Sequence, residues 1–214
     1  MADTRDFMSY FSQWAPQYDD TVNNPEGIFA EVFAGYDSIL NEVVQRLQVP
    51  GAVVDLGSGT GNLALRCFWA GVSTICVEPN PEMRALARQK LPPQSRILNG
   101  NFLDIPLPDK SVDAVTSCWA FHHLTDEEKV DAAREIDRVV KSQGKIVMVD
   151  TVYESEQARN QLWQKLSETG RQVWVEELQA EYYTTLDVLN SVFMGVGRKP
   201  QFKRMNPWVW LWEA

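Results

Sequence analysis

The chain has 214 residues, of which 44% are hydrophobic and 23% charged, which is ordinary for a globular protein and enough for one domain with a sizeable core. Its net charge of −9 and the lack of a basic run argue against nucleic acid as a partner, because such binding depends on neutralising phosphates. No segment approaches the roughly 18 apolar residues of a membrane span, and the first residues have no apolar signal-peptide core. We therefore expect a small-molecule substrate, no membrane partner and no signal peptide.

The three cysteines, Cys67, Cys76 and Cys118, lie in apolar surroundings without C-x-x-C spacing. This pattern is typical of buried, reduced thiols. Because disulfides are rare in the cytoplasm, we expect a cytoplasmic protein.

Aromatic residues are concentrated near the N-terminus, and Tyr10, Trp14 and Tyr18 are candidate substrate or lid residues. In one interpretation they fold over a ligand pocket and exclude water from it. In the other they belong to an amphipathic helix that only packs on the core. The sequence favours neither interpretation.

The next predicted element is a long helix from Asn24 to Leu47. Asn24 is a good N-cap, Pro25 suits the first helical position, and apolar residues keep helical spacing over about five turns. Pro50 and Gly51 end this helix, and the first strand is predicted at residues 52–56.

Helices and strands then alternate. The first predicted elements are a helix at 60–69, a strand at 73–77, a helix opened by Asn80 and Pro81, and strands at 96–98 and 112–118. A helix then begins at a capping box formed by Thr125 and Glu128, runs to about Lys141 and is ended by Gly144. A strand at 145–149 follows. Such alternation predicts a parallel sheet covered by helices on both faces.

The last third of the chain departs from this alternation. Helices are predicted at 156–169, 172–181 and 185–194, followed by strands at 201–205 and 208–212. The short Asn206-Pro207 turn between these strands predicts an antiparallel hairpin. We expect Trp208, Trp210 and Trp212 to lie on one face of the last strand and to pack against a helix.

A glycine-rich turn follows the first strand, in which Gly57, Gly59 and Gly61 leave backbone N–H groups open to a ligand. A dinucleotide loop follows the pattern G-x-G-x-x-G/A, in which the third small residue lets the helix pack on the strand. In this chain that third position is Asn62. The turn therefore favours S-adenosylmethionine over NAD.

Further candidate cofactor residues follow at the ends of the next strands. Glu78 stands 21 residues after Gly57, where a carboxylate can accept both ribose hydroxyls of an adenosine group. Asn101 follows the third strand, where a side-chain oxygen meets the adenine amine. The full predicted cofactor set is Asp55, Gly57, Ser58, Gly59, Glu78, Pro79, Asn101, Phe102 and Cys118.

Both histidines of the chain, His122 and His123, follow the fourth strand, at the sheet edge where the glycine-rich turn is also expected. Histidine titrates near neutral pH, so these two are the best candidates for a general base. As neighbours, at most one is expected to face the pocket. The alternative is that they only pack and hydrogen-bond within the loop.

No metal site is predicted. A metal-dependent catechol-type enzyme would place an acidic residue near Cys118 and Trp119, and Asp150 at the end of the fifth strand has no evident ligand partners. No Asn/Asp-Pro-Pro-Tyr/Phe sequence follows the fourth strand, so a nucleobase or glutamine amide is not the expected acceptor.

Taken together, residues 53–61, 78–80, 100–102 and 120–126 resemble class I S-adenosylmethionine-dependent methyltransferases. Trp14-Ala15, Tyr18-Asp19, residues 31–37 and 181–184 and the tryptophan-rich C-terminus are similar to the YrrT-like group of bacterial methyltransferases. The resemblance implies an α/β fold, namely a Rossmann-like doubly wound seven-stranded sheet in the order 3-2-1-4-5-7-6. It also implies cofactor contacts at Gly57, Glu78 and Asn101, although that group would have Asp in place of Asn101.

We expect a single methyltransferase domain, in which residues 1–50 form N-terminal lid helices, 51–150 the cofactor-binding core, and 151–214 the substrate-side helices and hairpin. The leading hypothesis is direct, in-line methyl transfer from S-adenosylmethionine to a small molecule. One alternative is a non-catalytic protein that binds S-adenosylmethionine or S-adenosylhomocysteine, and a more remote one is a nicotinamide-dependent dehydrogenase. Neither the acceptor nor the oligomeric state is predicted.

Overall fold

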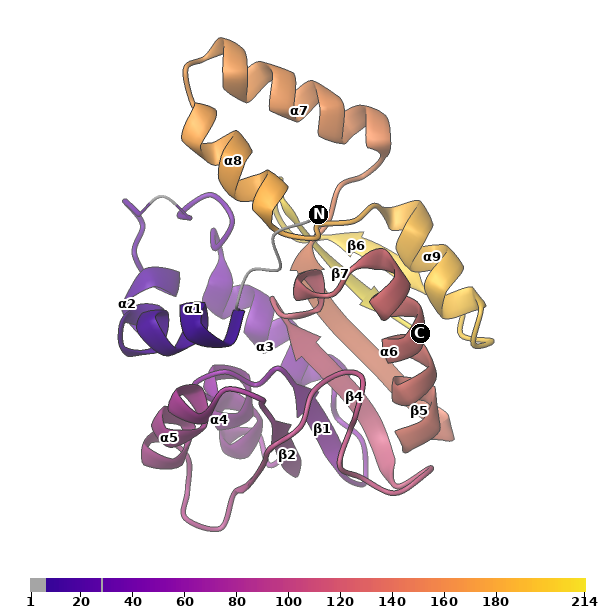
Figure 1. Cartoon of the computed structure of the whole chain (residues 1–214). Coiled ribbons are helices and arrows are strands. Elements are labelled where there is room, and N and C mark those ends of the chain that lie inside the picture. The colour runs from indigo at the N-terminus through magenta and orange to yellow at the C-terminus, as the bar shows by residue number, and fades with distance from the viewer. Residues whose placement is uncertain (1–6, 28) are drawn as a thin grey trace.

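The computed structural model describes residues 7–27 and 29–214, with the side chains of residues 7, 8, 10, 173 and 177 left out. Its centre is a seven-stranded sheet in the order β3-β2-β1-β4-β5-β7-β6 (Figure 1). The strands are β1 (Val53–Leu56), β2 (Thr74–Val77), β3 (Arg96–Leu98), β4 (Val112–Cys118), β5 (Val140–Thr151), β6 (Gln201–Arg204) and β7 (Val209–Glu213). Neighbours from β3 to β5 are parallel, whereas β7 is antiparallel to both β5 and β6. The predicted fold class, strand order and terminal hairpin are confirmed.

Helices cover both faces of the sheet. They are α1 (Phe7–Trp14), η1 (Ala15–Gln17), α2 (Tyr18–Val22), α3 (Tyr36–Arg46), α4 (Asn62–Trp69), α5 (Pro81–Lys90), η2 (Phe121–His123), α6 (Asp126–Val139), α7 (Glu156–Glu168), α8 (Gln172–Ala180) and α9 (Leu186–Met194). One apolar core packs α6 and α9 on the sheet, and the other packs α3 and α4 on the opposite face. None of the helices in the described part of the chain is long and apolar enough to cross a bilayer.

Local capping signals were read correctly from the sequence. The Asn80 side chain accepts from two N–H groups at the start of α5, and Thr125 and Glu128 form the expected capping box of α6. Thr185 caps α9 in the same way. These interactions join residues only a few positions apart, so the sequence contains both partners.

The long helix predicted from Asn24 is wrong, because only its second half is helical, as α3. Gly35 adopts a left-handed φ of 78° immediately before that helix. The Asn24 side chain accepts from a nearby N–H in a local turn. The amide of Asn206, far along the chain, donates to the carbonyls of Val32 and Ala34 at 3.0 Å each, so a tertiary contact replaces helical bonding there.

The sequence predicts that Gly144 ends α6, and this prediction is wrong. The helix stops at Val139, and β5 begins at the next residue, pairing with β4 through a register shift. A Cβ at Gly144 would lie 2.8 Å from the carbonyl oxygen of Asp113, so the glycine permits close approach of the two strands at this irregularity.

The three C-terminal tryptophans do not share one face. Trp210 and Trp212 belong to the core cluster that includes α6 and α9. Trp208 precedes β7 and packs in the opposite cluster, with its ring 5.7 Å from that of Trp174 in α8. The turn before β7 interrupts the alternation on which the prediction rested.

Candidate active site

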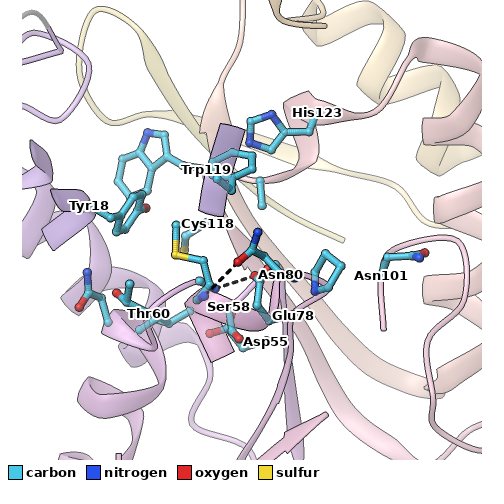
Figure 2. Close-up of a pocket in the computed structure, with 18 of the residues that line it drawn as sticks. Tyr18, Asp55, Ser58, Thr60, Glu78, Asn80, Asn101, Cys118, Trp119 and His123 are labelled. Atoms are coloured by element: carbon cyan, nitrogen blue, oxygen red, sulfur yellow. Dashed lines mark hydrogen bonds between the residues drawn. The ribbon is translucent and has the colours of Figure 1, made fainter. Parts of the chain in front are cut away.

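The carboxyl ends of β1, β2 and β4 open into a cavity roofed by α1 and α2 (Figure 2). Figure 2 shows Asp55, Ser58, Glu78 and Asn80 gathered on one side of this cavity, with Trp119 across from them. We call it the first cavity. Parallel strands bring these residues to one edge of the sheet although they lie far apart in sequence.

Gly57 is required at the base of this cavity. Its φ of 65° lies in the left-handed region, and a Cβ there would come within 2.5 Å of the Cβ of Ala120. A side chain at Gly57 would therefore push apart β1 and the segment that follows β4.

We predict that Gly57→Ala destabilises the protein by about 2–4 kcal/mol, from left-handed strain and overpacking together. The matched control is Gly59→Ala, because Gly59 has a similar φ of 55° but no atom within 4 Å of the added Cβ. This control should cost only the strain, about 1–2 kcal/mol. Urea unfolding of both variants measures the difference, and equal losses would contradict the proposed contact with Ala120.

Glu78 is fixed by its backbone surroundings. Its two carboxylate oxygens accept from the N–H groups of Gly59 (2.9 Å) and Asn80 (2.8 Å), and the residue is 6% exposed. Burial raises the pKa of Glu78, against the opposing effect of these hydrogen bonds. The carboxylate therefore stands in one orientation beside the glycine loop, with lone pairs left for further donors.

Asp55 lacks a partner for one of its oxygens. Its Oδ2 is buried without a hydrogen bond among the described residues, and so is the hydroxyl of Ser58. Burial, and secondarily the charge of Glu78, raises the pKa of Asp55 to about 8. Because unsatisfied buried polar atoms are costly, these two groups fit a ligand that brings a cationic amino group and hydrogen-bonding groups of its own.

The N-terminal segment is tied to the glycine loop through Asp19. This carboxylate accepts from the hydroxyl of Thr60 (2.7 Å) and the amide of Asn62 (3.0 Å), and pairs with Lys90 at 2.6 Å. Asn62, the residue that argued against a dinucleotide, is thus an anchor for the segment that includes Tyr18. We call these four residues the Asp19 latch.

We predict that Asp19→Asn weakens cofactor binding about 10-fold while leaving core stability nearly unchanged. The substitution removes a charge-assisted bond worth about 1.5 kcal/mol from the latch, so the segment covers the cavity less of the time. Asp20→Asn is the control, since Asp20 is exposed on the same short helix. Titration calorimetry with S-adenosylhomocysteine measures both, and equal affinities would show that the latch has no part in binding.

The other predicted cofactor residues also reach the first cavity. Pro79, Phe102 and Cys118 line it, and burial raises the pKa of the Cys118 thiol. Asn101 stands apart in Figure 2, and its Oδ1 already accepts from the N–H groups of Leu103 (2.8 Å) and Asp104 (3.0 Å). That oxygen therefore shapes a turn, whereas the sequence had suggested that it would be open to adenine.

Of the predicted lid residues, Tyr18 lines the first cavity and a second one beside it, and Trp14 lines only the second. Tyr10 belongs to α1, but its side chain lies outside the described residues.

Aromatic side chains form most of this second cavity, with Phe29, Phe33, Trp119 and Trp174 among them. Trp119 lines both cavities. Its φ of 50° is strained for a tryptophan, and its ring packs 5.1 Å from that of Tyr36 and 5.5 Å from that of Phe33. The strained residue holds an aromatic partition between the two cavities.

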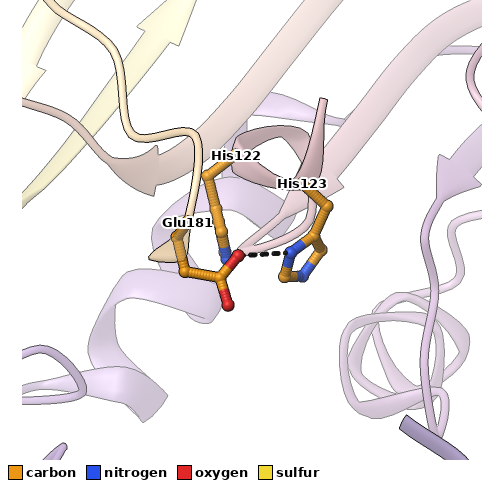
Figure 3. A group of neighbouring side chains, drawn as sticks. All are labelled: His122, His123 and Glu181. Atoms are coloured by element: carbon orange, nitrogen blue, oxygen red, sulfur yellow. Dashed lines mark hydrogen bonds and ion pairs between the residues drawn. The ribbon is translucent and has the colours of Figure 1, made fainter. Parts of the chain in front are cut away.

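Of the two histidines only His123 lines the first cavity, as expected, whereas both line the second. His122 Nδ1 lies 2.6 Å from Asp150, and His123 Nδ1 lies 3.1 Å from Glu181 (Figure 3). Burial lowers the pKa of His122, but the Asp150 carboxylate outweighs this and leaves it raised. Burial and the neighbouring His122 lower the pKa of His123.

Sequence reasoning missed Glu181, Asp19 and Lys90 as site residues. Glu181 lies 58 positions from His123, and Lys90 lies 71 positions from Asp19. Neither pair has a local spacing signal, so only the folded chain reveals them.

Comparison with known proteins agrees with this architecture. Residues 54–148 match the methyltransferase domain family. The chain is 39% identical over 98% of its length to an uncharacterized methyltransferase of Geobacillus sp. (strain WCH70), covering 98% of that protein. It is also 39% identical to the uncharacterized methyltransferase YrrT of Bacillus subtilis (strain 168), with 98% of both chains covered.

Among solved structures, a possible histamine N-methyltransferase from Thermotoga maritima, described as SAM-dependent, shares the fold with a TM-score of 0.69 and 20% identity, over 96% of this chain and 97% of that one. A complex of DhpI with SAM and HEP has a TM-score of 0.69 and 18% identity, over 97% and 94% of the two chains. The near full-length relatives confirm the resemblance seen in the sequence. The chain belongs to the YrrT-like group of S-adenosylmethionine-dependent methyltransferases.

Proposed function

We propose that the protein transfers a methyl group from S-adenosylmethionine to a small-molecule acceptor. The observation that carries this proposal is the buried Asp55 oxygen, which has no partner within the described part of the chain, beside a glycine loop and a fixed Glu78. The cofactor's ammonium group would pair with Asp55, and its ribose hydroxyls would donate to Glu78. A nicotinamide dinucleotide has no ammonium group to offer Asp55.

We place the acceptor in the second cavity. This cavity and the first share Phe11, Tyr18, Trp119 and His123, so an acceptor there would lie beside the cofactor cavity. Bound S-adenosylmethionine supplies a methyl group already activated by its positive sulfur. The chain's contribution is to orient the acceptor in line with that methyl group and to exclude water.

His123 and His122 are the proposed catalytic residues. His123 touches both cavities, with its Nδ1 held by Glu181, and is therefore placed near any proton that the acceptor must lose. We propose that the three regions divide the work as the sequence suggests: 1–50 closes the site, 51–150 binds the cofactor and 151–214 shapes the acceptor side. Reduced cysteines and the small-molecule acceptor are consistent with work in the cytoplasm.

The rival function is a protein that binds the cofactor without turning it over. The test is a single-turnover reaction in which methyl-labelled S-adenosylmethionine and excess enzyme are mixed with a bacterial metabolite pool. We expect label in a small molecule and stoichiometric S-adenosylhomocysteine, both reduced in His123→Ala. Tight cofactor binding with no label transferred would favour the non-catalytic binder, and unchanged transfer by His123→Ala would remove His123 from catalysis.

A further inference from the structure

Three metal-ligating side chains converge at the floor of the second cavity. His122, His123 and Glu181 each offer a ligand atom, and these atoms all lie within 4.8 Å of one another. Figure 3 shows the Glu181 carboxylate reaching the two rings from the connection that follows α8. The side chains of His122, His123 and Glu181 are 11%, 20% and 12% exposed, so the group is screened from bulk solvent but open to the cavity.

The orientation of His122 is set by a carboxylate on its far side. Asp150 Oδ1 lies 2.6 Å from His122 Nδ1, and Asp150 itself is fixed because it accepts from the backbone N–H groups of His122 (3.0 Å) and Thr151 (2.7 Å). This engagement of Nδ1 leaves Nε2 as the nitrogen available to a ligand. A carboxylate behind a histidine in this way is the usual support of a metal-binding imidazole.

We propose that His122, His123 and Glu181 bind a divalent transition-metal ion of the zinc class. Two imidazole nitrogens and one carboxylate oxygen are the ligand set of open zinc sites, in which a fourth position remains for water or substrate. That position would face the aromatic second cavity. Asp150 is a positioning residue that keeps His122 in the ligating tautomer.

A bound ion would help to deprotonate the acceptor. An acceptor heteroatom bound to it loses its proton to water more readily, since a bound cation lowers the pKa of its ligands. The electron pair left on that atom then forms the new bond to the methyl carbon, while the carbon–sulfur pair stays on sulfur. With the ion bound, His122 and His123 would act as its ligands, and the acceptor's proton would go to water and not to His123. This use of the ion rests on the proposed function, whereas binding of the ion does not.

Residue spacing in the sequence does not indicate this group, because Glu181 lies far along the chain from the two histidines. The contact between Asp150 and His122 is likewise visible only in the folded chain. The prediction of no metal weighed acidic residues near Cys118, where catechol-type enzymes place them. The structure instead brings together Glu181 and the two histidines that follow shortly after Cys118.

The test uses the full chain without a histidine tag, stripped by a chelator and titrated with Zn²⁺ against a competing chromophore. We expect one ion per chain, and Co²⁺ in its place should give the visible absorption of a low-coordination site. Glu181→Gln should weaken Zn²⁺ binding at least about 100-fold, and Asp150→Asn about 10–100-fold. Glu176→Gln, an exposed acid on α8 five residues before Glu181, should bind as the wild type does.

Binding of S-adenosylhomocysteine to the same variants separates this proposal from the proposed function. Glu181→Gln is expected to keep cofactor binding, which shows that it folds. No stoichiometric uptake of Zn²⁺ or Co²⁺ by the wild type, or equal affinity in Glu181→Gln, would overturn the metal site. Loss of S-adenosylhomocysteine binding in the wild type with Zn²⁺ uptake intact would instead overturn the proposed function alone.

Discussion

Glu78→Gln is expected to abolish measurable cofactor binding while leaving a folded protein. The carboxylate would accept two ribose hydroxyls in charge-assisted bonds worth about 1.5–3 kcal/mol each, so its loss should weaken binding by roughly 100-fold or more. The glutamine amide group would also face the N–H group of Gly59 or Asn80, both of which now donate to Glu78. A donor would then meet a donor, and the loop would lose its fixed shape.

Thermal unfolding with S-adenosylhomocysteine measures this effect. Ligand at about 100 times its dissociation constant adds about 2.7 kcal/mol to the wild type, which is several degrees for a domain of this size. At the same concentration a roughly 100-fold weaker Glu78→Gln should gain no more than about 0.4 kcal/mol. Glu82→Gln is the control, because Glu82 is exposed in the first turn of α5. A full shift in Glu78→Gln would place the ribose elsewhere.

Asp55→Asn is expected to weaken cofactor binding but to increase in stability relative to the wild type as the pH rises. With a pKa of about 8, Asp55 keeps a proton in the folded, cofactor-free protein that the unfolded chain loses above about pH 4. The free energy of unfolding therefore falls as the pH rises from about 4 to about 8, by at most about 1.4 kcal/mol per pH unit from this group. Asp55→Asn removes that contribution, so its stability relative to the wild type should grow with pH across this range.

Cofactor binding should favour the ionised form of Asp55, whereas burial in the cofactor-free protein favours the protonated form. A cationic amino group beside the carboxylate favours the ionised form, so binding at pH 7 should release up to about one proton. Calorimetry in two buffers of different ionisation enthalpy measures that release. Asp55→Asn should release none from this position and bind about 10–100-fold more weakly. Tight binding by Asp55→Asn with the same proton release would remove Asp55 from the cofactor site.

The grouping of the proposed cofactor residues in one cavity could be predicted from the sequence because its signals are local or carried by strand order. The glycine pattern around Gly57 predicts the loop, and Glu78 follows at the end of the next strand. Alternation of helices and strands then brings both to the same sheet edge. The first cavity accordingly includes every predicted cofactor residue.

The acceptor half depends on contacts between distant segments. Glu181 meets His123 because the segment after α8 returns to η2, where the N–H of Tyr182 donates to the carbonyl of His122, and the turn before α3 forms because Asn206 satisfies its carbonyls. Hydrophobic spacing over 24–47 favours a helix on local grounds, and tertiary hydrogen bonds override it. Such pairings carry no signal in the spacing of a single sequence.

The central claim is that the glycine loop, Asp55 and Glu78 bind S-adenosylmethionine. The most direct measurement is titration calorimetry of the wild-type chain with S-adenosylhomocysteine and, separately, with NADH. We predict one S-adenosylhomocysteine per chain with micromolar or tighter affinity, about −8 kcal/mol or better, and no heat from NADH. Tighter binding of NADH, or no binding of S-adenosylhomocysteine, would contradict it.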